Sequence, residues 1–196
     1  ERAGLNFQTG LRSILRQDPD IIMIGETRDP ETAEISARAA ITGHLVFSTL
    51  HTNDAASSVT RLMDMGIPAY LAAASIAGII SQRLMRKVCP YCQEEYEARP
   101  EEVKILYGRP ADPGEHVRLR RGKGCYLCNE TGYKGRNAIH EILSVDTEMK
   151  RMISEGRNEE ELKAYAIRSH GMTTLKEDPL QTLLAGITTF AQMARL

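Results

Sequence analysis

Two stretches of similar design decide the fold: Asp18-Pro-Asp-Ile-Ile-Met-Ile-Gly-Glu-Thr-Arg-Asp29 and Thr42-Gly-His-Leu-Val-Phe-Ser-Thr-Leu-His-Thr-Asn53. In each stretch an apolar run leads to a side chain that can take part in chemistry, Glu26 in the first and His51 in the second. The run Ile21–Ile24 has no polar alternation, which is typical of a strand buried on both faces of a parallel sheet. We therefore expect two buried strands that each deliver one polar side chain.

The segment between the two runs has the signals of a helix. Asp29 is a good N-cap, Pro30 suits the first helical position, and Gly43 suits the end of the helix. A strand, a helix and a strand at this length predict a right-handed βαβ unit. Ligands of open parallel sheets lie at the carboxyl ends of the strands, where both Glu26 and His51 stand.

His44 is a second histidine of the same stretch, but it opens the strand that contains Leu45–Phe47. At about 3.3 Å per residue it should lie ~20 Å from His51, at the opposite edge of the sheet. An acid such as Glu26 at the end of a buried strand matches the Walker B arrangement, in which it orients water or magnesium during phosphoryl transfer. Taken alone, Glu26 could be a solvated loop acid and His51 a polar strand end; their occurrence on neighbouring strands favours a site.

Composition and charge narrow the class of protein. The chain has 196 residues, 42% of them hydrophobic, and a net charge of −1, so it could form one domain or two small ones. The near-zero charge gives no general field that would favour nucleic acid or a membrane. No apolar run approaches the length of a membrane-spanning helix, and no signal peptide is recognisable. The first residue is Glu rather than Met, as we expect of a fragment.

Four cysteines occur as two pairs, Cys89-Pro-Tyr-Cys92 and Cys125-Tyr-Leu-Cys128, separated by 32 residues. Two Cys-x-x-Cys turns can supply the four thiolates of a tetrahedral zinc site. A closed site of four sulfurs leaves no position for water, so the predicted role of the zinc is structural. Free buried thiols or a redox pair are the alternatives.

The segment around the second cysteine pair is basic. A zinc module with basic and aromatic residues could bind nucleic acid, but surface cations are usually only solvated, and we expect no nucleic acid partner. A protein or acidic-lipid contact is a better use of these side chains. The cations are Arg118, Arg120, Arg121, Lys123, Lys134 and Arg136.

Outside these motifs the pattern is mostly helical. Pro68 should open a long helix that reaches about Lys87, and the segment from Asn137 to Leu143 should be a strand or a packed extended segment. Asp146 and Asn158 are expected N-caps of two later helices, the second with a capping box.

The strings Leu11–Asp29 and Thr42–Asn53 resemble the secretion ATPases of bacterial type II secretion and type IV pilus assembly. The resemblance covers essentially the whole chain, and the two branches of the family share these motifs. It implies that Glu26 is the catalytic acid of a Walker B box and that His44 and His51 belong to a histidine box. Many family members also carry a tetracysteine module. Thr27 stands where the family more often has an aliphatic residue.

The resemblance also implies parts that these residues lack. No Gly-x-x-x-x-Gly-Lys-Ser/Thr occurs in the sequence, so the residues that cradle the phosphates are absent from it. We expect that loop, and an acidic box after it, to lie before Glu1, and the chain alone to be inactive. The family implies a parent homo-hexamer that uses ATP and Mg²⁺. It would act in the cytoplasm, peripheral to the inner membrane through secretion or pilus platform proteins.

The expected fold class is α/β, with three parts. Residues 1–87 would form the second half of a RecA-like core, a partial parallel sheet with flanking helices. Residues 88–137 would form the tetracysteine zinc module, and residues 138–196 a helical carboxyl-terminal subdomain. A non-catalytic, zinc-stabilised interaction module is the second hypothesis. A RecA-like nucleic-acid motor is the third, which the near-zero net charge disfavours.

Overall fold

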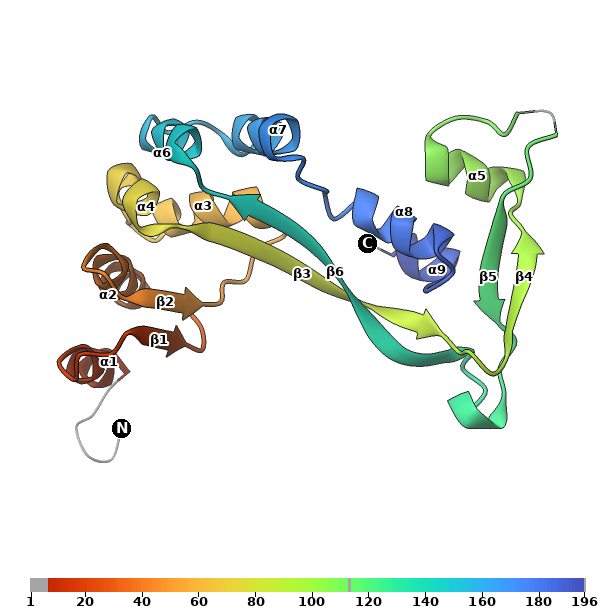
Figure 1. Cartoon of the computed structure of the whole chain (residues 1–196), viewed down its shortest axis with the longest axis horizontal. Helices are drawn as coiled ribbons and strands as arrows, with labels where there is room; N and C mark the ends of the chain where they lie inside the picture. Colours follow the sequence, from red (N-terminus) through yellow and green to blue (C-terminus); the bar gives the residue numbers. More distant parts are fainter. Residues whose placement is uncertain (1–6, 113, 196) are drawn as a thin grey trace. The chain divides into compact units, whose positions relative to one another are not determined.

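The computed structural model describes residues 7–112 and 114–195, which form two compact units (Figure 1). The first unit contains the residues up to Ser81 together with Ile142–Met172. The second contains Gln82–Glu141 and the residues from Thr173 onward. The fold is of the α/β class, as expected.

The first unit contains the predicted strand–helix–strand motif. Strand β1 (Ile21–Ile24) pairs in parallel with β2 (Leu45–Ser48), and α2 (Pro30–Ile41) connects them. Asp29 caps α2 as expected, because its carboxylate accepts the Thr32 N–H at 2.9 Å. Helix α1 (Phe7–Leu15) contributes to the core of this motif, because its Leu11 packs with Ile22, Ile24 and Ala39.

The prediction that β1 is buried on both faces is wrong for the described residues. Ile22 and Ile24 are buried, whereas Ile21 and Met23 are 61% and 67% exposed. The register pairs Ile21 with Leu45 and Met23 with Phe47, so four apolar side chains share the exposed face. The reason is that the described helices of this motif cover one face, and successive side chains of a strand point to opposite faces.

A helical core forms the rest of the first unit. Its helices are α3 (Ala55–Asp64), α4 (Ala69–Ser75), α6 (Thr147–Ser154) and α7 (Glu159–His170). Small residues let these helices approach closely: Ala55, Ala56, Val59, Ala72 and Ala166 are fully buried. The expected N-caps are confirmed, since the carboxylate of Asp146 accepts the Met149 N–H and Asn158 forms a capping box with Glu161.

The long helix predicted from Pro68 to about Lys87 is wrong. Helix α4 ends at Ser75, and residues 78–88 form strand β3 (Gly78–Val88). Strand β3 pairs with β6 (Tyr133–Ser144), which contains the extended segment predicted from Asn137. The β-branched residues Ile79 and Ile80 favour a strand. The deciding partner, β6, begins 45 residues after β3 ends, where local periodicity cannot reveal it.

The described residues of the second unit form a small antiparallel sheet, three short α-helices and the 3-10 helix η1 (Tyr126–Cys128). Strand β4 (Gln93–Glu97) pairs with β5 (Arg118–Gly122), and α5 (Pro100–Tyr107) lies between them in sequence. Leu106, Leu119 and Leu183 form its core with α8 (Glu177–Leu184) and α9 (Phe190–Met193). The late helices thus divide between the two units, and their grouping into one subdomain at 138–196 is not confirmed.

Candidate functional site

Glu26 and His51 meet just beyond the carboxyl ends of β1 and β2. The Nε2 atom of His51 lies 2.7 Å from the Oε1 atom of Glu26. A guanidinium nitrogen of Arg28 lies 2.5 Å from the other carboxylate oxygen. The Glu26 side chain is 20% exposed, whereas that of His51 is 87% exposed. The parallel register therefore brings together the two side chains that the sequence singles out.

Hydrogen bonds beyond the strand ends hold the backbone on both sides of Glu26. The Thr27 N–H donates to the Thr49 carbonyl at 3.0 Å, and the Thr49 hydroxyl donates to the Gly25 carbonyl at 2.7 Å. The hydroxyls of Thr27 and Ser48 are 2.7 Å apart. Thr27 is buried, so the hydroxyl that departs from the family pattern makes a contact that an aliphatic side chain could not make.

A pocket of about 310 Å³ opens at this point of the first unit. Besides Glu26 and His51, Arg61 of α3 lines it. Arg61 belongs to α3, the helix that follows His51 in sequence. The remaining lining residues are Thr27, Arg28 and Leu50.

The pocket combines one carboxylate with three side chains that can carry positive charge. A carboxylate of this kind can bind a divalent cation or accept a hydrogen bond from water. Cations such as Arg28 and Arg61 can stabilise the negative charge of a phosphate. The arrangement is suited to binding or cleaving a phosphate-containing ligand.

His44 lies away from this pocket, at the amino end of β2. Its Nδ1 atom is 3.0 Å from the Ala39 carbonyl and 3.2 Å from the Thr42 hydroxyl. These contacts tie the start of β2 to the end of α2. His44 and His51 thus lie beyond opposite ends of β2, as expected.

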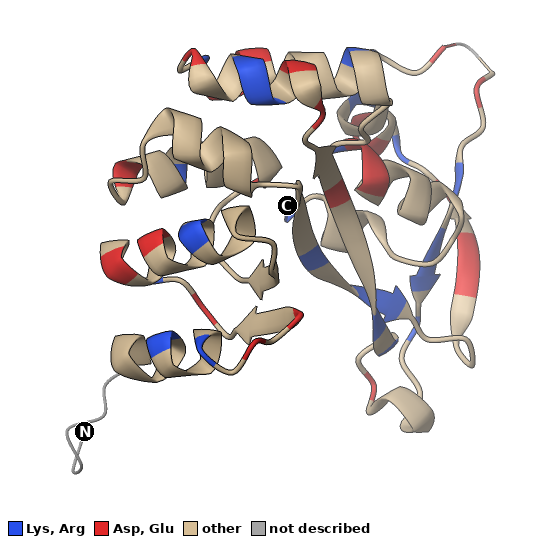
Figure 2. Cartoon of the chain, turned by 60° about the vertical axis from the view of Figure 1, so that its left-hand side comes forward, with Lys and Arg blue, Asp and Glu red and all other residues tan. Residues whose placement is uncertain are grey.

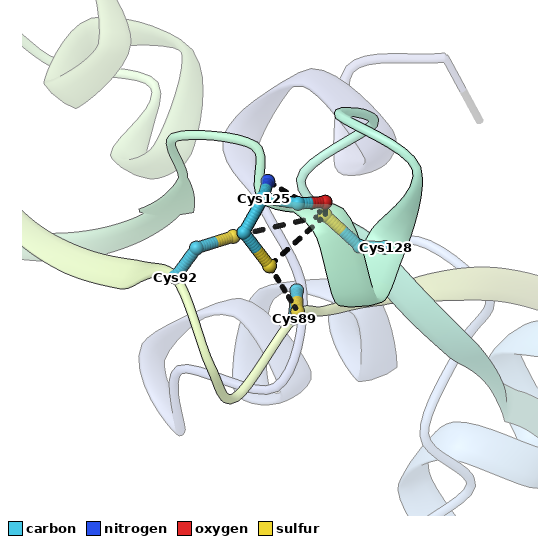
Figure 3. Close-up of side chains that lie close together, drawn as sticks. All are labelled: Cys89, Cys92, Cys125 and Cys128. Carbon is cyan, nitrogen blue, oxygen red and sulfur yellow. Dashed lines mark hydrogen bonds between the residues drawn. The ribbon is translucent and has the colours of Figure 1, made fainter.

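The four cysteines converge in the second unit, as predicted (Figure 3). All four sulfurs lie within 4.8 Å of one another. The Sγ atoms of Cys89 and Cys125 are 3.9 Å apart, as are those of Cys92 and Cys128. Four sulfurs placed about 2.3 Å from a central ion in a tetrahedron would be roughly 3.8 Å apart. The donor set and its spacing therefore fit a metal ion bound by four thiolates.

Backbone groups favour the thiolate form at one of the four sulfurs, that of Cys128. The N–H groups of Cys125 and Gly132 point at the Cys128 sulfur from 3.2 and 3.3 Å. Although burial by itself would raise the pKa of the Cys128 thiol, these N–H groups help to lower it to about 6. The backbone of Gly122 passes so close to Gly132 that a Cβ on Gly122 would lie 2.1 Å from the Gly132 carbonyl oxygen. Glycine at that crossing allows the chain before and after the second cysteine turn to approach closely.

Acidic side chains face most of the cations that the sequence singles out near these cysteines. In the antiparallel register, three basic residues of β5 stand opposite three glutamates of β4, so the blue strand β5 runs beside red segments of β4 in Figure 2. Arg121 and Lys123 both form ion pairs with Glu94, at 2.8 and 2.7 Å, and Arg120 pairs with Glu95 at 3.1 Å. Much of this positive charge is therefore balanced locally.

Comparison with known proteins identifies the family. The family model described as "Type II/IV secretion system protein" matches residues 1–195. The chain belongs to this family. The match agrees with the resemblance noted in the sequence, and it covers both units.

Relatives from both branches of the family are similar over nearly the whole chain. The type IV pilus assembly ATPase PilB of Thermus thermophilus is 50% identical over 98% of this chain and 21% of the relative. The type II secretion system ATPase E of Vibrio cholerae is 44% identical over 100% of this chain and 38% of the relative. The chain thus spans only about a fifth to two fifths of the length of these relatives.

Solved structures share the fold. The pilus retraction motor PilT with bound ADP has a TM-score of 0.64 and 27% identity, over 97% of this chain and 43% of that one. The ATPase DotB of Legionella pneumophila has a TM-score of 0.63 at 23% identity, over 97% of this chain and 42% of that one, a likeness of fold alone.

Among the described residues no helix is long and apolar enough to cross a membrane.

Proposed function

We propose that this chain is the carboxyl-terminal part of a hexameric motor ATPase that couples ATP hydrolysis to the assembly of pilins or pseudopilins. The observation that carries the proposal is the contact between Glu26 and His51 at the carboxyl ends of two adjacent parallel strands. The relatives support the proposal, because their names describe ATPases of type II secretion and pilus assembly. The parent would work in the cytoplasm against inner-membrane platform proteins.

In this proposal Glu26 is the catalytic acid. Its carboxylate would orient the attacking water or help to hold Mg²⁺. A bound ATP with its Mg²⁺ would supply the reactive phosphoryl group and balance its charge. His51 and Arg28 hold the carboxylate in place, and Arg61 supplies positive charge towards the phosphates. His44 supports β2, the strand that leads to His51, from its amino end.

The residues of this chain provide only part of a nucleotide site. The printed sequence has no Gly-x-x-x-x-Gly-Lys-Ser/Thr, so it has neither the clustered backbone amides nor the lysine that bind the β- and γ-phosphates in P-loop ATPases. The proposal therefore places that loop in an upstream part of the parent protein.

We further propose that the four cysteines hold one structural zinc ion. Thiolate sulfurs are soft ligands, and four of them in a tetrahedron favour zinc over the oxygen-loving Mg²⁺ or Ca²⁺. The ligands Cys89 and Cys92 precede β4, and Cys125 and Cys128 follow β5. A metal ion would thus join the two ends of the segment that contains β4, α5 and β5.

A second candidate function is a zinc-stabilised interaction module without catalysis of its own. The observation in its favour is the lack of a phosphate-binding loop in these 196 residues. The interaction-module hypothesis concerns this chain by itself, whereas the motor hypothesis concerns the longer parent protein. The two differ in what the longer protein should do.

ATP turnover in two forms of the protein tests the proposal. A parent of the relatives' length should hydrolyse ATP with Mg²⁺ at a rate typical of enzymes, on the order of 1 to 10 per second. The chain of residues 1–196 should show no turnover above background at the same concentration. A parent without ATPase activity would refute the motor, and turnover by the chain alone would show that nucleotide binds elsewhere.

A further inference from the structure

Lys163 of α7 reaches the start of α3, more than a hundred residues earlier in the chain. Its Nζ atom lies 3.1 Å from the Oδ2 atom of Asp54, and the two side chains are only 31% and 28% exposed. Both residues belong to the first unit. The contact therefore links the late helical segment of that unit to the element that follows the histidine box.

Asp54 is the N-cap of α3 and uses its other oxygen for that purpose. Its Oδ1 atom accepts the Ser57 N–H at 2.9 Å, and the Ser57 hydroxyl contacts the Asp54 backbone N–H in return. Burial raises the pKa of Asp54, but the bonds from Ser57 and the charge of Lys163 outweigh burial and lower that pKa below its usual value. One carboxylate thus joins a helix cap to an ion pair.

The start of α3 matters because two pocket side chains depend on it. His51 comes three residues before Asp54, and Arg61 lies farther along α3; both line the pocket with Glu26. The loop between His51 and α3 is tied to the helix, since the Thr52 hydroxyl lies 2.7 Å from the Ser58 hydroxyl. A shift of α3 would move His51 and Arg61 together relative to Glu26, which follows β1.

Apolar packing also holds α3 against α7. The buried residues Ala55 and Val59 of α3 and Leu162 and Ala166 of α7 belong to one core cluster. The hydrophobic effect that drives this burial has no preferred direction, whereas an ion pair joins two particular atoms. The ion pair supplies a fixed point between α7 and the first turn of α3.

We propose that Lys163 is a positioning residue for nucleotide hydrolysis, acting through Asp54 and α3 on His51 and Arg61. The inference rests on the proposed function. Lys163 does not line the pocket, so its effect should fall on the geometry of the hydrolytic step rather than on nucleotide binding. Reaction rates depend steeply on sub-ångström placement of the groups around the reacting atoms.

The kinetic test uses the parent protein with ATP and Mg²⁺. Lys163→Met removes the charge and keeps most of the length, and it should lower kcat about fivefold, the size expected for a partly exposed ion pair. The KM for ATP should change by less than about twofold. Lys163→Arg should restore most of kcat. The matched control is Lys150→Met, which removes an exposed lysine of α6 and should leave kcat unchanged.

A double mutant identifies the route. Asp54→Asn keeps an N-cap side chain, because Asn caps helices as well as Asp does, but removes the charge that pairs with Lys163. If Lys163 acts through Asp54, adding Lys163→Met to Asp54→Asn should lower kcat little further. Independent, multiplicative losses in the double mutant would overturn the inference, as would a Lys163→Met protein with normal kcat.

Hydrogen exchange gives a readout that does not depend on activity. In the parent protein, Lys163→Met should speed exchange of the amides of Asp54 and Ser57 several-fold, while Lys150→Met should not. Unchanged exchange at these amides would overturn the inference whatever the kinetics show. A wild-type parent that does not hydrolyse ATP would refute the proposed function instead, and the exchange result would still decide whether Lys163 holds the start of α3.

Discussion

Replacement of Glu26 by Gln separates catalysis from stability at the proposed site. Gln keeps the shape of the side chain and removes the negative charge that meets His51 and Arg28. The partner side chains are 87% and 77% exposed, and ion pairs with such exposed partners contribute only about 0 to 1 kcal/mol to stability. Glu26→Gln should therefore change the free energy of unfolding by less than about 1 kcal/mol.

The effect on turnover should be far larger. Loss of one positioned charged group at a reacting centre lowers kcat by about 10²- to 10³-fold, or roughly 3 to 4 kcal/mol of transition-state stabilisation. Nucleotide affinity should change much less, because most phosphate contacts are expected in the upstream loop. The assay is steady-state ATP turnover by the parent protein, with nucleotide binding and thermal unfolding measured on the same samples.

Glu31→Gln is the matched control for Glu26→Gln. Glu31 also pairs with an arginine, Arg12, and lies five residues farther along the chain, in the first turn of α2. Its replacement removes the same charge from the same part of the unit and should leave kcat near normal. The assignment of Glu26 is refuted if Glu26→Gln keeps more than about a tenth of wild-type turnover, or if Glu31→Gln is equally damaging.

Three further predictions concern the metal, a histidine and pH. Protein purified without added metal should contain about one zinc ion per chain, and Cys125→Ser should unfold residues 88–137, because metal binding and folding are coupled; well under one zinc per chain by elemental analysis would contradict the site. His44→Ala should lower the free energy of unfolding by about 1 kcal/mol, because it removes the hydrogen bond to the Ala39 carbonyl. The value of kcat should change at most slightly. If His44→Ala loses more turnover than His51→Ala at equal stability, the roles assigned to the two histidines are reversed. The N–H of Met149, the hydroxyl of Tyr165 and His170 lower the pKa of Asp146 to about 2 from 3.8. Its stabilising contribution should therefore be complete above pH 3.8 and lost as the pH falls through about 2, and Asp146→Asn should flatten that part of a stability–pH curve measured by circular dichroism.

The sequence by itself determined the local elements of the site. Asp29 and Pro30 mark the start of α2, and the apolar runs before Glu26 and His51 mark β1 and β2, since caps and apolar runs act over a few residues. The parallel direction followed from the length of the connection. The cysteine spacing likewise predicted a cluster of four sulfurs, which the structure confirms.

Contacts between distant segments were decided by the tertiary structure alone. Residues 76–88 have an apolar pattern that suits a helix, and their pairing with β6 makes them a strand. The apolar run of β1 could not reveal that one of its faces is exposed in this chain. The same holds for the acids of β4 that balance the cations of β5, and for Lys163 beside Asp54. Such contacts depend on how folded elements pack, and a local pattern of hydrophobicity or caps carries no information about the partner that a side chain meets across the fold.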